Sequence, residues 1–316
     1  MASTNALQLT QWEQLNDGQK RHQFQQLLRY FVSPLLPISQ IRPYHYGFKG
    51  YQFNSYQALI AGFDFVFIPG DAQAKLGLSP QRIHDLMATL PEASQSISQQ
   101  LLGQQTFDMA PMLVAKTPVA LKRQPQGMIA IKTGEFFGDP LFAKRRQDDI
   151  QNTLGHLRQT TTDPDTQQLP KQIVNAASIS TLMADQRYYQ VTTKRPEQTP
   201  DQLSQALSQQ GMTLLDHWDY LYLRNTKYPS IFPWGNAYQV PTWPVAQETY
   251  FGLTYPLALN QAELLTQGLV GTRSQASKVD QALSLSPYYL NTLDLAQFNA
   301  DQIFYRPQIA IVLSDD

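Results

Sequence analysis

The segment from Phe63 to Gly70, which reads FDFVFIPG, places the strongest constraint on the fold. It is a short run of aromatic and β-branched residues that closes on a Pro-Gly turn signal, the pattern of a buried strand. Similar short runs predict further strands at 112–115, 128–131 and 308–313. The chain is therefore expected to build sheets from short, buried strands.

Helical periodicity appears between these strands. After Asp17, an expected helix cap, apolar residues from Phe24 to Phe31 follow the i, i+3, i+4, i+7 spacing of one helix face. Ser79 and a following proline open a second predicted helix, which runs to about Leu90. Both patterns are typical of amphipathic helices packed on a core.

Two more predicted helices lie close together in the second half of the chain. Proline near the first helical position and glycine beyond the last place one helix between Thr199 and Gly211. The next is expected to begin at Thr213 or a neighbour, with Leu214 and Trp218 on its apolar face. Because strands and helices follow no regular βαβ order, the sequence predicts an α+β fold.

Composition narrows the classes of function. The 316 residues include no cysteine, which excludes disulfides, cysteine zinc sites, iron–sulfur clusters and thiolate nucleophiles. The formal net charge is −1, so the chain lacks the excess of positive charge that is typical of proteins that bind nucleic acids or anionic membranes. No stretch approaches the ~20 apolar residues of a membrane span, and the first residues show no signal-peptide pattern. We expect a cytoplasmic protein with neither nucleic-acid nor membrane partners.

An ordered set of motifs lies between Pro200 and Asn236. Gly211 follows the third predicted helix, and the segments Trp218-Asp219-Tyr220 and Phe232-Pro233-Trp234-Gly235-Asn236 come after it. In this order they resemble the formylglycine-generating enzyme, or sulfatase-modifying factor, family. Weaker similarities at 65–70, 116–119, 251–253 and 305–307 extend the resemblance from about Phe63 to the C-terminus. The resemblance implies a C-type-lectin-like α+β domain.

Departures from the family's motifs bear on activity. The family's cap threonine falls on Leu214, and its glutamate before the tryptophan falls on His217. The glycine-asparagine segment G-N-V-x-E-W is missing, and 268–272 is at best a remnant of R-G-G-S-W. Catalytic members use a cysteine pair with copper, and this chain has no cysteine. Formylglycine generation by that mechanism is excluded, and the resemblance is to a divergent member of the family.

We expect two parts in the chain. Residues 1–60 form a helical and aromatic lead-in packed on the main body, and residues 61–316 form the formylglycine-generating-enzyme-like domain. Whether 1–60 is a separate module stays open. Its aromatic run, from Tyr44 to Tyr56, is expected to fill a core or seam, with a ligand platform as the alternative. The polar segment 160–170 is a predicted loop.

An alternative function would use the histidines as metal ligands. A second branch of the same fold holds iron with three histidines in sulfoxide synthesis. The five histidines here are His22, His45, His84, His156 and His217, and no two form an H-x-x-H or H-x-x-x-H pair. Ligands drawn from distant segments would still permit a divergent metal-dependent oxidoreductase. No cofactor is predicted, although a structural calcium ion would fit relatives of this fold.

Five residues are candidates for ligand binding: His217, Trp234, Asn236, Arg273 and Arg306. Trp234 and Asn236 lie on a predicted turn, where binding residues concentrate. The two arginines offer bidentate contacts to an anionic group. Structural roles stay open beside these: a partly buried core histidine for His217, an aromatic anchor for Trp234, and a brace at a sheet end for Arg306.

Three functions are consistent with these observations. The first is a non-catalytic binding or scaffold protein whose partner is a small molecule, a peptide or a protein. The second is the divergent oxidoreductase, and the third is a lectin-like phage or surface recognition protein. The lack of the family's catalytic residues favours the first, although a fold by itself does not specify a function.

Overall fold

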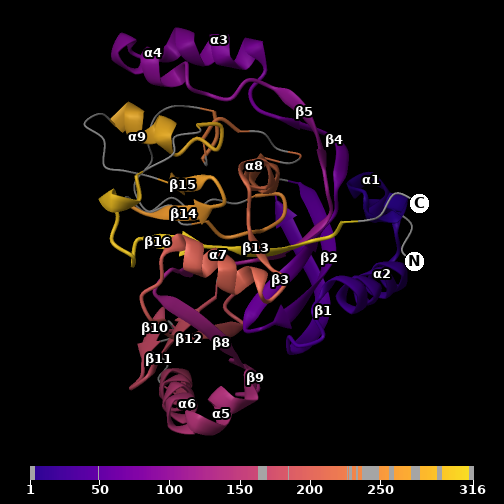
Figure 1. Ribbon diagram of the computed structural model, residues 1–316, viewed down its shortest axis with the longest axis vertical. Coiled ribbons are helices and arrows are strands. Elements are labelled where there is room, and N and C mark those ends of the chain that lie inside the picture. The colour runs from indigo at the N-terminus through magenta and orange to yellow at the C-terminus, as the bar shows by residue number, and fades with distance from the viewer. Residues whose placement is uncertain are drawn as a thin grey trace.

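The computed structural model describes residues 4–48, 50–162, 169–183, 185–225, 227, 230–232, 234–236, 249–255, 260–271, 278–289 and 294–312. It is an α+β structure in which several sheets follow one another along the longest axis, with helical pairs at both ends (Figure 1). The coarse prediction of an α+β fold is confirmed. No helix in the described part of the chain is long and apolar enough to cross a membrane.

The largest sheet has six strands, and each neighbouring pair is antiparallel. In spatial order the strands are β1 (Ile38–Phe48), β2 (Tyr51–Ile60), β3 (Phe63–Ile68), β6 (Met112–Ala115), β17 (Pro307–Ala310) and β13 (Thr213–Leu214). The predicted strands at 63–68 and 112–115 are therefore confirmed. The predicted strand at 308–313 is confirmed for its first residues, since β17 ends at Ala310.

β3 shows why its sequence is almost wholly apolar. Phe65 and Phe67 point into one hydrophobic cluster, while Val66 and Ile68 point into another on the opposite face of the sheet. Successive side chains of a strand point to opposite faces, so a strand covered on both sides must be apolar at consecutive positions. The six-stranded sheet is thus the central layer of the molecule.

N-terminal helices cover the first of these clusters. They are η1 (Thr4–Leu7), α1 (Leu9–Gln14) and α2 (Asp17–Phe31). The cap of α2 is Asn16, whose side chain forms a capping box with Gln19, so the prediction of Asp17 as the cap is wrong by one residue. Asp17 instead lies in the first turn, where its carboxylate interacts favourably with the helix dipole.

The segment from 1 to 60 shares its interior with the rest of the chain. Leu7, Trp12 and Phe24 pack in the same hydrophobic cluster as Ile309 of β17. The aromatic run also faces inward in part. Tyr44 is buried, and its hydroxyl donates to the carbonyl oxygens of Phe251 and Gly252.

Two helices flank the short strand β13. α7 (Pro200–Ser208) begins after a Thr199 cap, as predicted, and packs Leu203 and Leu207 on the first cluster. α8 (His217–Asn225) packs on the second cluster, on the other face of the central sheet. The prediction that this helix begins near Thr213 is wrong. Thr213 and Leu214 pair with β17, and the Asp216 side chain accepts the Asp219 backbone N–H, so the helix starts only after Asp216.

A five-stranded antiparallel sheet forms the end of the molecule that carries α5 (Pro140–Arg145) and α6 (Gln147–Thr162) (Figure 1). Its strands, in spatial order, are β10 (Gln172–Val174), β11 (Ser178–Leu182), β12 (Tyr188–Lys194), β8 (Arg123–Ala130) and β9 (Phe136–Gly138). The predicted strand at 128–131 is confirmed for 128–130, which form the end of β8. Part of the predicted loop at 160–170 belongs to α6, and 163–168 lie outside the described residues.

The remaining elements are a four-stranded sheet, a two-stranded ribbon and helices near the opposite end. The sheet contains β15 (Gly268–Gly271), β14 (Ala262–Leu265), β16 (Ile303–Tyr305) and β7 (Val119–Ala120), with β14 and β16 parallel. The ribbon pairs β4 (Asp71–Leu76) with β5 (Gln105–Met109). The helices are α3 (Pro80–Thr89), α4 (Glu92–Ser98), α9 (Lys278–Ser284) and η2 (Leu295–Gln297). Ser79 caps α3, as predicted.

Candidate functional site

A tight turn of the central sheet packs against the five-stranded sheet. Between β2 and β3, Ala61 and Gly62 both have positive φ, 50° and 85°. The turn lies directly on the backbone of β8: a Cβ at Gly62 would stand 2.9 Å from the carbonyl carbon and oxygen of Pro125. Only glycine permits so close an approach in this conformation. The turn therefore fixes where the two sheets meet.

A cleft opens at this junction, beneath α7, and we call it the α7 cleft. Its volume is about 280 Å³. Its apolar lining residues are Leu36, Pro37, Ala61, Phe63, Pro125, Leu203, Ala206 and Leu207. Its polar lining residues are Gln124, Gln126, Asp139, Arg195 and Gln210. Apolar walls with a few convergent polar groups are typical of ligand sites.

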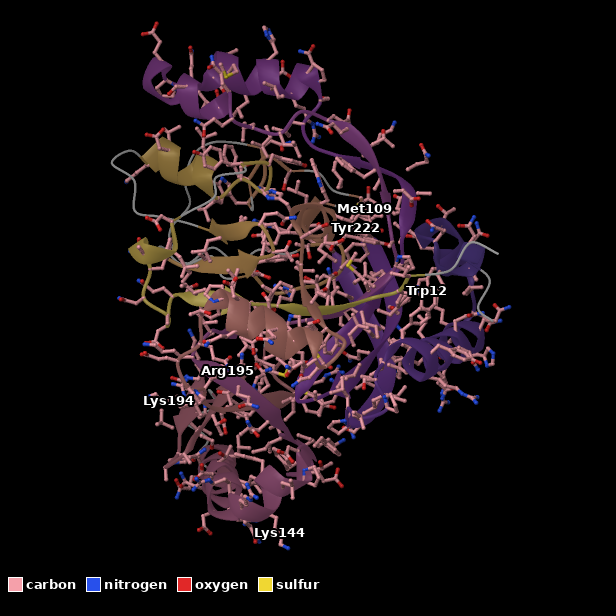
Figure 2. The ribbon with its side chains drawn as sticks, viewed as in Figure 1. Trp12, Met109, Lys144, Lys194, Arg195 and Tyr222 are labelled. Atoms are coloured by element: carbon pink, nitrogen blue, oxygen red, sulfur yellow. The ribbon has the colours of Figure 1, made fainter. Side chains whose placement is uncertain are left out.

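Arg195 is the cationic residue of this lining. It follows β12 directly, and Figure 2 shows it between α7 and the five-stranded sheet. Its backbone N–H donates to Lys122, its Nη2 donates to the Tyr305 hydroxyl at 2.8 Å, and its guanidinium lies 5.0 Å from the centre of that ring. Burial raises the pKa of Tyr305 to about 12, so its hydroxyl stays neutral at physiological pH.

The second amino group of Arg195 is different. Its Nη1 is buried and has no hydrogen-bond partner among the described residues. A buried donor left unsatisfied costs roughly 1–3 kcal/mol, more when the group is charged. The arrangement therefore holds the guanidinium in place through Nη2, while Nη1 is enclosed without an acceptor among the described residues.

Gln126 of β8 and Asp139, which follows β9, add an amide and a carboxyl group to the lining. Gln126 donates through Nε2 to the Thr193 hydroxyl, and its backbone carbonyl accepts the Asp139 backbone N–H. The Asp139 side chain caps α5 by accepting the backbone N–H of Leu141 at 2.8 Å. Asp139 thus brings a negative charge to the same cleft as Arg195.

Positive charge gathers beside the cleft, where β8 begins and β12 ends. Arg123 and Lys194 are directly opposite each other across these antiparallel strands. Like charges in such a cross-strand pair are destabilising. The neighbouring Lys122 is paired with the exposed Asp301 at 3.2 Å, so its charge is compensated. Of these basic residues, Arg195 lines the cleft itself, whereas Arg123 and Lys194 alternate to the other face of the sheet from Gln124.

Arg306, a candidate from the sequence, is completely buried away from this cleft. Its Nε donates to Glu263 at 2.8 Å, and its Nη1 donates to the carbonyls of Ala115 and Lys116. Its Nη2 donates to the Thr254 carbonyl. These protein acceptors occupy the guanidinium, in keeping with the brace that the sequence left open for it.

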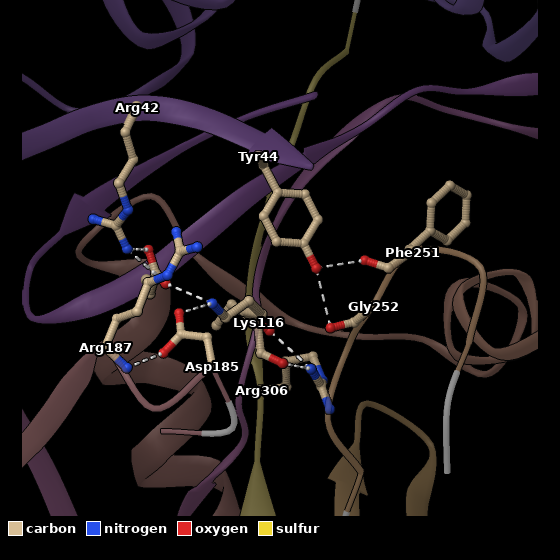
Figure 3. A network of polar contacts seen from close by, with 10 residues as sticks. Arg42, Tyr44, Lys116, Asp185, Arg187, Phe251, Gly252 and Arg306 are labelled. Carbon is tan, nitrogen blue, oxygen red and sulfur yellow. Dashed lines mark hydrogen bonds and ion pairs between the residues drawn. The ribbon is translucent and has the colours of Figure 1, made fainter. Parts of the chain in front are cut away.

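A second polar network lies close to Arg306 (Figure 3). Lys116 forms ion pairs with Asp64 at 3.2 Å and with Asp185 at 3.4 Å, and Arg42 reaches the same Asp64 at 3.1 Å. Asp64 and Lys116 are buried on the central sheet, whereas Asp185 belongs to the turn between β11 and β12. The network therefore ties the five-stranded sheet to the central sheet.

His217, a second candidate, opens α8. Its backbone N–H donates to the Gln267 side chain, while its Nε2 is buried without a partner among the described residues. Burial lowers the pKa of His217, although Asp216 acts in the opposite direction. Burial and the nearby Asp216 carboxylate raise the pKa of Asp219 to about 6, even though Gln308 donates to it at 2.7 Å.

Trp234 and Asn236 form part of a turn. Trp234 stacks on Phe232 with ring centroids 5.3 Å apart and planes 5° apart. The Asn236 side chain accepts the backbone N–H of Ile231 at 3.2 Å. Arg273 lies outside the described residues. None of the four described candidates lines the α7 cleft.

The histidines do not assemble a recognisable metal centre in the described part of the chain. No group of three or more His, Cys, Asp or Glu side chains lies close enough together there to hold an ion. His45, for example, is exposed and shares a 2.8 Å hydrogen bond with Asn54.

Comparison with known proteins does not identify a family for this chain. No protein-family profile matches the chain, and no curated protein matches it significantly.

Arg195 is the functional candidate that the sequence did not reveal. It stands in the segment Lys194-Arg195-Pro196, which carries no specific motif. The available signal is the pair of dibasic segments, 122–123 and 194–195, but only the pairing of β8 with β12 brings them together.

Proposed function

We propose that this chain is a non-catalytic binding protein with a formylglycine-generating-enzyme-like, C-type-lectin-like fold, and that it binds its ligand in the α7 cleft. One observation carries the proposal: the cleft combines apolar walls with the guanidinium of Arg195, which a hydrogen bond to Tyr305 holds in place. Such a site supplies both hydrophobic burial and a positioned cation to a ligand.

Local structure between 200 and 236 supports the fold assignment. The order α7, Gly211, β13, α8 and then the turn at Phe232 follows the order of motifs in the resemblance. Gly211 has a φ of 71°, as a glycine that ends a helix commonly has. The catalytic members' cysteine pair has no counterpart in a chain without cysteine, which supports a binding role.

Filling the cleft tests the proposal. Ala206 lines the cleft from α7, so Ala206→Trp would place an indole in the space that a ligand needs. Ser204 is exposed on the same helix, and Ser204→Trp adds the same side chain outside the cleft. Ligand-observed NMR would compare both variants with the unmodified protein against amino acids, N-acetyl peptides, small carboxylates and monosaccharides.

We expect at least one compound class to bind the unmodified protein and Ser204→Trp while losing affinity for Ala206→Trp. Binding that Ala206→Trp leaves intact, or no binding by any class, would refute the cleft as the site. Saccharides as the sole ligands would point to the lectin-like alternative. Stoichiometric iron or copper in the purified protein would point to the oxidoreductase.

A further inference from the structure

The guanidinium of Arg195 is held rigidly on one side. Tyr305 accepts a hydrogen bond from Nη2 and presents its ring to the guanidinium plane. Both contacts restrict the side chain before any ligand arrives, which lowers the entropy lost on binding. The guanidinium is consequently a positioned cation rather than one on a freely rotating side chain.

Charge in the cleft favours an anion of low charge. Arg195 lines the cleft with a cation, and Asp139 lines it with a carboxylate. A doubly charged phosphate would meet Asp139 and would find few donors. A carboxylate carries one negative charge and is the natural partner of a guanidinium.

The rest of the lining favours an apolar group and amide groups next to the anion. Phe63, Leu203 and Leu207 offer hydrophobic contacts, and Gln124 and Gln210 offer side-chain amides that pair with peptide groups. Carboxylate, apolar side chain and amide occur together at the C-terminus of a peptide that ends in an aliphatic residue.

We infer that the α7 cleft binds ligands that carry a carboxylate beside an apolar side chain, as an aliphatic peptide C-terminus does, and that Arg195 binds the carboxylate. This inference rests on the proposed function and names the ligand class of the same site. Selectivity follows because a carboxylate forms a charge-assisted hydrogen bond with the Arg195 guanidinium, whereas a neutral amide offers only an uncharged carbonyl acceptor.

A matched pair of probes tests the inference on the unmodified protein. N-acetyl-Gln-Leu as the free acid carries the carboxylate, and its C-terminal amide has nearly the same shape without the charge. By NMR titration we expect the acid to bind about tenfold or more tightly than the amide. In Arg195→Gln this difference should vanish. Lys144→Gln, which removes a charge at the far end of α5 (Figure 2), should preserve it.

A third probe separates two sources of the same chemistry. If 4-methylpentanoate binds as tightly as N-acetyl-Gln-Leu, the site takes free aliphatic carboxylates; if it binds more weakly, the peptide groups contribute and a peptide C-terminus is the ligand. Equal affinity of acid and amide, or no binding of any acid, would overturn the inference. If the acid and the amide bind equally well and Ala206→Trp abolishes the binding of both, the inference fails but the proposed function stands. If Ala206→Trp does not affect binding, the inference and the proposed function both fail.

Discussion

Arg306 and Glu263 form an ion pair that is completely buried, with 2.8 Å between Nε and Oε1. Glu263 belongs to β14, and Arg306 lies between β16 and β17, where it also reaches the end of β6 through the Ala115 carbonyl. The pair therefore connects the four-stranded sheet with the central sheet.

Glu263→Gln should destabilise the protein strongly. The substitution leaves the Arg306 charge buried without a counter-charge, and breaking a buried pair in this way costs about 3–5 kcal/mol. Urea unfolding would measure the loss. Asp301→Asn is the control, because Asp301 is 68% exposed in its pair with Lys122 and such pairs contribute about 0–1 kcal/mol. Similar losses in both variants would contradict the structural role of Arg306.

Gly62→Ala should cost more than Gly50→Ala. Both glycines have a φ of 85°, so both substitutions introduce the same backbone strain. A Cβ at Gly50 meets nothing within 4 Å, whereas a Cβ at Gly62 collides with the backbone of Pro125. Overpacking of this kind adds about 1–3 kcal/mol. Thermal unfolding of the two variants would measure the difference, and equal stabilities would show that the turn does not rest on β8.

Asp219→Asn should increase the free energy of unfolding more at neutral pH than at acidic pH. The pKa of Asp219 is raised from 3.8 to about 6, so the folded state binds the proton more tightly than the unfolded state. The stability that this proton contributes is present below pH 4 and is lost as the pH rises to about 6. At one pKa unit per 1.36 kcal/mol, the cost of ionisation at pH 7 is about 3 kcal/mol.

Asparagine carries no charge and keeps an acceptor for Gln308. Relative to the unmodified protein, Asp219→Asn should therefore gain roughly 1–3 kcal/mol between pH 4 and pH 7. Urea unfolding at both pH values would measure it. A difference between the two proteins that does not vary with pH would contradict the raised pKa.

Removal of divalent and transition metals should leave the protein unchanged. The proposed binding function needs no ion, and His, Asp and Glu side chains do not gather in groups of three in the described segments. We expect equal melting temperatures before and after dialysis against EDTA, with substoichiometric metal by inductively coupled plasma mass spectrometry. Stoichiometric calcium alone would indicate a structural ion and leave the binding proposal intact.

Local patterns allowed much of the secondary structure to be predicted. The apolar runs of β3 and β6 are interpretable because both faces of these strands are buried. Thr199 and Ser79 mark helix starts through the side-chain oxygens that cap them. The start of α8 was misjudged because Leu214 fits the helical spacing of its neighbours, while its pairing with distant β17 decides its conformation.

The α7 cleft could not be predicted in the same way. Its lining comes from segments as far apart as Leu36, Pro125 and Gln210, and their proximity depends on how two sheets pack. No periodicity in the sequence indicates how two sheets pack against each other. The roles of Trp234 and Arg306 were likewise open from sequence, because an aromatic or a guanidinium can serve a ligand or the interior equally well.

The position of β17 has a consequence for biosynthesis. Of the six strands in the central sheet it is the last to leave the ribosome, yet it lies between β6 and β13. Until it emerges, a nascent chain that has already formed β3 and β6 must present an apolar strand with an open edge, which is a template for aggregation. The central sheet is therefore completed only after Ala310 has been translated, and we expect molecular chaperones to bind the nascent chain until then.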